Sequence, residues 1–157
     1  MQLMIKQRVF SWGDSYDVYD ESGEARYFVQ AEVFVFGHQI HVYDKRSGRE
    51  VGSIHQKLFT MLPTFEIVMG GQTCGQVRRE FSFLTPRYYV DFLDWEVEGN
   101  CFHWDYDVIS GRSRVLSIHK ELLSWGDTYI LEYNSISHEI PGLLLAIAID
   151  AANCKNN

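Results

Sequence analysis

Residues 143–149 read LLLAIAI, an uninterrupted apolar segment, and Pro141 stands two residues before it. A proline is tolerated in the first turn of a helix, and leucine and alanine favour helix over strand. At about 100° per residue, the side chains of this segment cover nearly the whole circumference of a helix, so no face remains for water. The segment is too short for a bilayer, which requires about 20 apolar residues. We therefore predict a helix over about residues 140–154 that the rest of the protein encloses.

Turn-forming residues divide most of the remaining chain into short runs rich in Val, Ile, Tyr, Phe and Trp, as expected for antiparallel hairpins. The intervals between the turns are irregular and contain no helical segment, which excludes a propeller and parallel βαβ units. We therefore predict an all-β protein with one helix, folded as a closed antiparallel barrel of about 11–12 strands around the C-terminal helix. The predicted turns lie at residues 20–23, 45–48, 70–71, 98–100 and 110–111.

Length and composition fit one domain over residues 1–157. The chain is 46% hydrophobic and has only three prolines, and a chain of this length buries roughly 70% of its unfolded surface without disulfides or structural metals. The N-terminus lacks the apolar core of a secretory signal. Cys74, Cys101 and Cys154 are odd in number and lack CxxC spacing, which favours reduced thiols. We therefore expect a cytoplasmic protein without a transmembrane segment.

An internal repeat supports the strand assignment. SWGDSY at residues 11–16 returns as SWGDTY at 124–129, and weaker copies lie at 60–65 and 83–88. Structural roles in the turns are sufficient to explain the glycine, aspartate and tryptophan residues of the two strong copies. Their tryptophans could instead form a membrane-interface or ligand-stacking surface. Positions two apart on a strand share a face, so aligned residues of this kind are expected to point inward. These are Tyr16, Phe65, Tyr88 and Tyr129, followed by Val18, Ile67, Val90 and Leu131. Tyr89 and Ile130 stand at positions where alternation expects polar residues, which suggests that their two strands are covered on both faces.

Basic side chains recur upstream of the repeated turns, at Lys6, His55, Arg78 and His119. Such a set could form a ring of cations at one end of the barrel and hold an anionic ligand, or it could consist of solvent-facing strand positions paired with acidic neighbours. The densest basic region supplies the candidate ligand-binding residues, because guanidinium groups suit phosphate geometry; surface salt bridges are the alternative. These candidates are Lys57, Arg78, Arg79 and Arg87.

The sequence carries no recognisable catalytic or metal motif. It lacks a GxSxG elbow, a phosphate loop, GxGxxG and HExxH. His38 and His41 would face opposite sides of a strand, and Cys101 and His103 share a strand face without a third ligand at standard spacing. The acidic stretch at residues 91–107 alternates with aromatic residues, which favours a solvated hairpin face over a calcium site or a carboxylate pair. We predict no catalytic residue, no metal and no cofactor.

Three segments together resemble the LURP-one-related proteins of the tubby C-terminal-like superfamily, which also includes the phospholipid scramblases. They are KQRVFSWGDSYDVYD at residues 6–20, HVYDKRSGREVGSIHQKLF at 41–59, and the apolar helix that ends near Asp150. The resemblance implies a closed barrel of about a dozen strands around a central hydrophobic helix. Tubby domains bind phosphoinositide head groups through exposed basic side chains, but none of those positions can be matched in this chain, and fold analogy alone does not assign a function.

The net charge of −7 argues against binding to DNA or RNA. Because structural roles explain most of the sequence features, we expect a cytoplasmic, non-enzymatic binding or interaction module of the LURP-one-related type. Its partner would be an unidentified protein or a small anionic ligand. The main alternative is a peripheral membrane sensor that recognises phosphoinositide-type head groups, with membrane contact only at the periphery. An enzyme with a scattered active site is a minor alternative.

Overall fold

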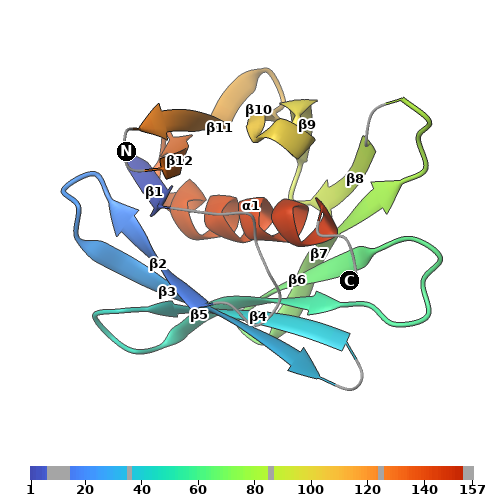
Figure 1. Ribbon diagram of the computed structural model, residues 1–157, viewed down its shortest axis with the longest axis horizontal. Helices are drawn as coiled ribbons and strands as arrows, with labels where there is room; N and C mark the ends of the chain where they lie inside the picture. The colour runs from blue at the N-terminus through green and yellow to red at the C-terminus, as the bar shows by residue number, and fades with distance from the viewer. Residues whose placement is uncertain (7–14, 35–36, 85–86, 124–125, 154–157) are drawn as a thin grey trace.

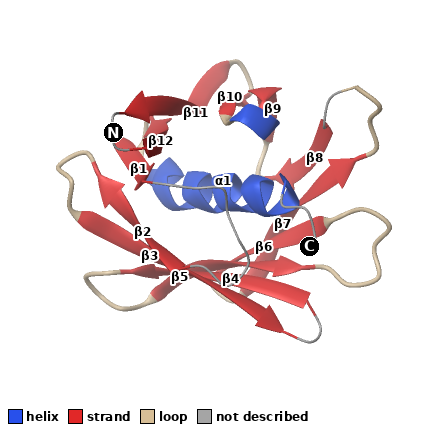
Figure 2. Ribbon diagram, in the orientation of Figure 1, coloured by secondary structure: helices blue, strands red, loops and turns tan. Residues whose placement is uncertain are grey.

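The computed structural model describes residues 1–6, 15–34, 37–84, 87–123 and 126–153. Its twelve strands form one antiparallel sheet that curls into a nearly closed barrel, with one helix running through the interior (Figure 1, Figure 2). The predicted fold class is confirmed. The elements are β1 (Gln2–Lys6), β2 (Ser15–Asp20), β3 (Ala25–Phe34), β4 (Gly37–Asp44), β5 (Glu50–Gln56), β6 (Thr64–Met69), β7 (Gln72–Glu80), β8 (Arg87–Phe92), β9 (Trp95–Asn100), β10 (Asp105–Ser110), β11 (Ser113–Leu123), β12 (Gly126–Tyr133), the 3₁₀ turns η1 (Cys101–His103) and η2 (Ile136–His138), and α1 (Glu139–Asn153).

The strands follow a meander in the order β8-β7-β6-β5-β4-β3-β2-β1-β12-β11-β10-β9. Every neighbouring pair is antiparallel, so all odd-numbered strands run in one direction and all even-numbered strands in the other. Connections that follow odd-numbered strands therefore share one end of the barrel. β8 and β9 are consecutive in the chain, yet they form the two ends of the sheet.

The core lies between the inner face of the sheet and α1. Inward positions such as Val18, Ile67 and Leu131 are almost completely buried, and Leu143 and Leu145 of α1 are fully buried. The helix spans Glu139–Asn153, close to the predicted 140–154. Of the other aligned positions, Phe65 and Tyr129 are buried, and Tyr16, Tyr88 and Val90 are partly buried against the core. Enclosure of an all-apolar helix satisfies the requirement that no face meets water.

Two glycines allow the helix to lie close to the sheet. A Cβ atom on Gly52 of β5 would lie 2.5 Å from Leu144 Cδ1, and one on Gly142 of α1 would lie 2.6 Å from Leu116 Cδ1. Both distances are far below van der Waals contact, so a larger residue would push the helix away from the strands. Glycine at these positions, as well as the predicted small alanines, sets the spacing between helix and sheet.

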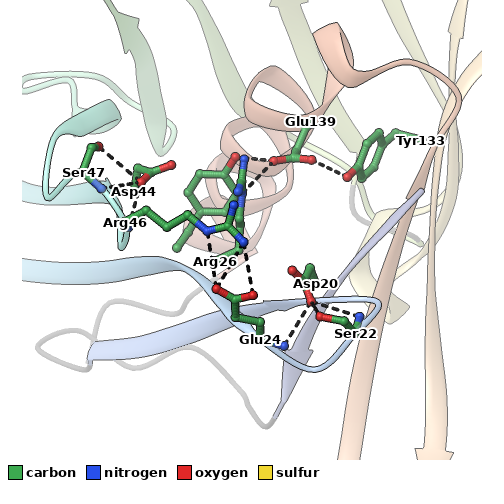
Figure 3. Close-up of polar contacts among 10 residues, drawn as sticks. Asp20, Ser22, Glu24, Arg26, Asp44, Arg46, Ser47, Tyr133 and Glu139 are labelled. Carbon is green, nitrogen blue, oxygen red and sulfur yellow. Dashed lines mark hydrogen bonds and ion pairs between the residues drawn. The ribbon is translucent and has the colours of Figure 1, made fainter.

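The start of α1 is tied to the barrel by a buried polar cluster (Figure 3). The hydroxyls of Tyr27 on β3 and Tyr133 on β12 each donate a hydrogen bond to a different carboxylate oxygen of Glu139. Arg26 Nε lies 3.6 Å from Glu139 Oε1. Because of burial and these contacts with Glu139, the pKa values of both tyrosines are raised. Hydrogen bonds to a charged acceptor are stronger than neutral ones, so this cluster defines where the helix begins.

Aspartates organise two of the predicted turns. Asp20 Oδ1 accepts hydrogen bonds from the backbone N–H groups of Ser22 and Glu24, both at 3.0 Å. Asp44 Oδ1 accepts from the N–H groups of Arg46 at 2.9 Å and Ser47 at 2.8 Å (Figure 3). Such side-chain acceptors replace a backbone carbonyl in closing the turn. The turns at 70–71 and 110–111 are also observed.

The region around residues 93–103 differs from the prediction. β9 continues through residues 98–100, and the turn to β10 follows at residues 101–104, which include η1. Leu93, whose φ is 54°, lies in a separate turn between β8 and β9. Cys101 and His103 do not share a strand face, because they lie in η1, where Cys101 is buried and His103 is exposed. Tyr89 is 42% exposed, so β8 is not covered on both faces as predicted, whereas Ile130 is buried.

Other predicted features lie outside the described residues. Trp12, Gly13 and Asp14 fall within residues 7–14, Trp125 within 124–125, and Cys154 within 154–157. The described Cys74 and Cys101 are free thiols; Cys101 is buried, as predicted for reduced cysteines of the core, whereas Cys74 is exposed.

Candidate functional site

Two connections project from the same end of the barrel, where α1 ends (Figure 1). The first, residues 57–63, follows β5, and the second, described over residues 81–84, follows β7. They share an end because β5 and β7 run in the same direction. The Lys57 N–H group donates to Thr64 O at 2.8 Å and closes the first connection, and the Arg79 N–H group donates to Pro63 O at 3.0 Å, which holds the end of β7 against that connection.

Large apolar side chains on these connections face solvent. Phe59 and Met61 are fully exposed, and Phe83 and Leu84 are 95% exposed. Contiguous exposed apolar patches in a folded protein mark interaction sites, because they gain nothing from contact with water. We call this region the loop surface. Its apolar members are Leu58, Phe59, Met61, Phe81, Phe83 and Leu84.

The backbone at Phe59 is unusual. Its φ is 58°, in the left-handed region that residues other than glycine rarely adopt. A bulky aromatic residue held in this conformation while fully exposed does not serve the core. Backbone strain of this kind concentrates at functional positions.

The four predicted ligand-binding cations surround the loop surface but do not form one cluster. Lys57 and Arg78 line an open groove of about 580 Å³. Arg79 lines a neighbouring groove of about 460 Å³. Adjacent residues on a strand point to opposite faces, which separates Arg78 from Arg79. Arg87, on β8, lies opposite Glu80 of β7. The two grooves share Leu62, Glu80 and Phe81.

Only one of these cations has a carboxylate partner within the described part of the chain. Arg78 Nη2 lies 3.7 Å from Glu80 Oε1, and the Arg78 guanidinium stacks 4.8 Å from the ring centre of Tyr89. For Lys57, Arg79 and Arg87, no such ion pair is found among the described residues. These three charges therefore remain available to an anionic partner.

The repeated basic positions also lie at this end, near the ends of odd-numbered strands, but their charge is largely compensated or absent. The Lys6 ammonium lies 4.5 Å from the ring centre of Tyr19, and His119 Nε2 lies 3.7 Å from Glu121 Oε1. Burial, together with the nearby His41, lowers the pKa of His55, so this imidazole is neutral at pH 7. Arg78 and His119 thus have the acidic neighbours expected of solvent-facing positions, whereas Lys6 and His55 contact Tyr19 and Ser53 instead.

One contact was missed in the sequence. Ser53 Oγ lies 2.9 Å from His55 Nε2, which resembles a nucleophile and its base. Ser53 is buried, however, and therefore has little access to a substrate. A Ser at i and a His at i+2 on one strand face is too common a pattern to have signalled this contact.

Ser117, His119 and Asp107 are a possible nucleophile, base and acid; Asp107 and Ser117 lie directly opposite each other on β10 and β11, but each contacts a different group. Ser117 Oγ donates to Glu132 Oε2 at 3.5 Å, whereas Asp107 Oδ1 contacts Arg114 Nη1 at 3.7 Å. In the described ranges, no group of three or more His, Cys, Asp or Glu side chains is placed to hold a metal ion. Among the described helices, none has the length and apolarity to span a bilayer.

A buried polar group lies near the last turn of α1. Burial raises the pKa of Asp150 to about 8 and that of Cys101 to about 11. Tyr88 and Tyr106 lie close enough to both groups for their charges to interact, and burial raises the pKa of Tyr88 to about 12. All four groups are therefore largely uncharged near neutral pH, which fits their position behind the sheet.

Comparison with known proteins adds three findings. The sequence model of the LURP-one-related family matches residues 1–150. The uncharacterised protein YxjI of Bacillus subtilis (strain 168) is 32% identical over 153 residues, which cover 96% of this chain and 92% of that protein. The X-ray structure of a protein from Arabidopsis thaliana superimposes with a TM-score of 0.62 at 16% identity, covering 95% of this chain and 89% of the other, and therefore shares the fold.

Proposed function

Because the chain belongs to the LURP-one-related family, and because its loop surface combines exposed apolar side chains with cations, we propose that it is a non-enzymatic binding module that attaches peripherally to anionic membranes. The observation that carries the proposal is the full exposure of Phe59 and Met61 beside Lys57, which has no carboxylate partner among the described residues. We also propose a cytoplasmic location, because the described cysteines are free thiols.

The geometry suits a lipid interface. Apolar tips enter the boundary between head groups and acyl chains, while neighbouring Lys and Arg side chains remain at the level of the phosphates. Each Lys or Arg close to an anionic leaflet contributes about 1 kcal/mol. Burial of one exposed Phe or Leu side chain adds about 1.5–3 kcal/mol. Together these terms suffice for reversible attachment without a transmembrane segment.

The overall negative charge does not oppose this attachment strongly. At physiological ionic strength the Debye length is about 8 Å, so acidic residues at the far end of the barrel are screened from the membrane. The local charge of the loop surface therefore decides the interaction with lipid, rather than the net charge of −7.

Vesicle co-sedimentation tests the proposal. Wild-type protein is mixed with phosphatidylcholine vesicles and with vesicles that also contain phosphatidylserine, at low and at physiological salt. We expect sedimentation with the anionic vesicles. The double variant Phe59→Ser, Met61→Ser should reduce it at both salt concentrations, and Arg79→Gln, Arg87→Gln mainly at low salt.

Matched controls lie at the opposite end of the barrel, in connections that follow even-numbered strands. Arg112→Gln changes an exposed arginine, and Ile136→Ser changes an apolar residue that is 65% exposed. Neither should alter sedimentation. Wild-type protein that stays in the supernatant with anionic vesicles at low salt refutes the lipid function and leaves a protein partner for the loop surface.

A further inference from the structure

The barrel has a seam between β8 and β9. Leu93 and Asp94 connect these two strands, but no backbone ladder joins them, and each pairs with only one neighbour. All residues from Arg87 to Asn100 belong to the described part of the chain. Figure 1 shows the two strands as separate ribbons at the two ends of the sheet. A strand edge without a partner presents N–H and C=O groups that can pair with another chain.

The core is incompletely covered along this seam. Val90 of β8 lies opposite Val77, and Val97 of β9 lies opposite Val108. Val77 and Val108 are fully buried, so all four valines face inward, yet Val90 and Val97 are only partly buried. The two strands that border the seam thus leave part of their inward apolar surface exposed.

Hydrogen-bonding groups behind the seam are also unsatisfied. The hydroxyls of Tyr88 on β8 and Tyr106 on β10 are buried and have no hydrogen-bond partner among the described residues. Tyr106 itself is only 3% exposed. Buried polar groups are nearly always paired, so these two hydroxyls mark a polar region of the interior behind the seam.

The outer surface next to the seam is strongly acidic. Glu96 and Glu98 project from β9, and Glu98 lies directly opposite Asp107 of β10. Like charges opposite each other across a strand pair are destabilising. Within the described residues, neither glutamate has a cationic partner, whereas Asp107 contacts Arg114 at 3.7 Å. This is the acidic stretch that the proposed membrane function leaves unexplained.

We propose that the free edge of β9 binds an extended segment of a partner protein in which apolar residues alternate with basic ones. Side chains of an added strand alternate between the two faces of the sheet. The apolar residues would cover Val90 and Val97, and the basic residues would lie beside Glu96 and Glu98. β8 is the less suitable edge, because its outer face carries Arg87 as well as Asp91, whereas the outer face of β9 carries Glu96 and Glu98 and no cation. This interaction is independent of membrane attachment.

The probe is a short synthetic peptide of alternating valine and lysine, blocked at both ends and labelled for fluorescence anisotropy. A peptide of the same composition, with all valines preceding all lysines, is the control for charge and hydrophobicity. Hydrogen exchange of the full-length protein locates the binding. We expect the alternating peptide to bind more tightly than the block peptide and to slow exchange in residues 95–100.

Glu98→Lys separates binding from folding. It replaces a repulsion with Asp107 by an attraction, so the thermal midpoint should not fall, while affinity for the alternating peptide should drop about fivefold or more. Glu21→Lys, an exposed reversal in the turn after β2, is the matched control and should leave affinity within about twofold. Equal affinity for both peptides, equal effects of the two variants, or unchanged exchange in residues 95–100 would each overturn the proposal.

Discussion

Replacement of Asp150 by asparagine tests whether the last turn of α1 is as dry as the structure shows. Asp150 is 8% exposed, and burial raises its pKa from 3.8 to about 8. Its position near the carbonyl end of the helix disfavours a negative charge as well. The wild-type protein therefore keeps this carboxyl protonated at neutral pH, and asparagine has a similar shape with no proton to lose.

The sign and size of the effect follow from proton linkage. Between the unfolded pKa of 3.8 and the folded pKa of about 8, the folded state binds one more proton than the unfolded state. The contribution of Asp150 to the free energy of unfolding is therefore fully present below pH 3.8. It is lost as the pH rises through this window, by up to about 1.4 kcal/mol per pH unit. From about pH 5 to about pH 8 the loss amounts to roughly 3.5 kcal/mol, a large fraction of the 5–15 kcal/mol typical of a domain.

Urea unfolding at several pH values measures this effect. The quantity of interest is the free energy of unfolding of Asp150→Asn minus that of the wild type, since histidines and other titrating groups cancel in the difference. Cys101, with a pKa of about 11, does not titrate in this range. We expect the difference to grow steadily with pH between about pH 5 and pH 8. A difference independent of pH would show that the carboxyl is hydrated or ion-paired, and the account of a dry helix end would be wrong.

Two further substitutions probe packing. Gly75→Ala would place a Cβ atom 2.2 Å from the backbone oxygen of Asp91, so we expect a loss of about 2 kcal/mol or more in urea unfolding; unchanged stability would mean that β7 and β8 are farther apart than the structure shows. Glu139→Ala leaves two buried tyrosine hydroxyls without their acceptor, and we expect a fall in the free energy of unfolding of about 2–4 kcal/mol. A change below about 0.5 kcal/mol would show that the Glu139 cluster does not anchor the helix.

Hydrophobic patterning predicted the architecture because burial acts along the chain in a regular way. An apolar helix with no polar face must be enclosed, and strands with period-two alternation supply an inner face to enclose it. The predicted helix differs from the observed Glu139–Asn153 by one residue at each end. Turns built on Asp20 and Asp44 were also predictable, because their acceptors are local in sequence.

The candidate site was only partly predictable. The basic residues were identified by their density in the chain, but strand alternation places Arg78 and Arg79 on different faces and in different grooves. The exposure of Phe59 and Met61 could not be foreseen, because in sequence they have the composition of core residues. Only the arrangement of the loops shows that none of the described residues covers them.

The sequence alone thus determined the class of fold and the place of the helix, since both follow from which residues must avoid water. The tertiary structure decided where closure fails, between β8 and β9, and which end of the barrel gathers the exposed loops. It also decided that Glu139 meets Tyr27 and Tyr133, which stand 112 and 6 residues away. The physical reason is that pairing across a curved sheet depends on the direction and register of distant strands, which local residue patterns do not encode.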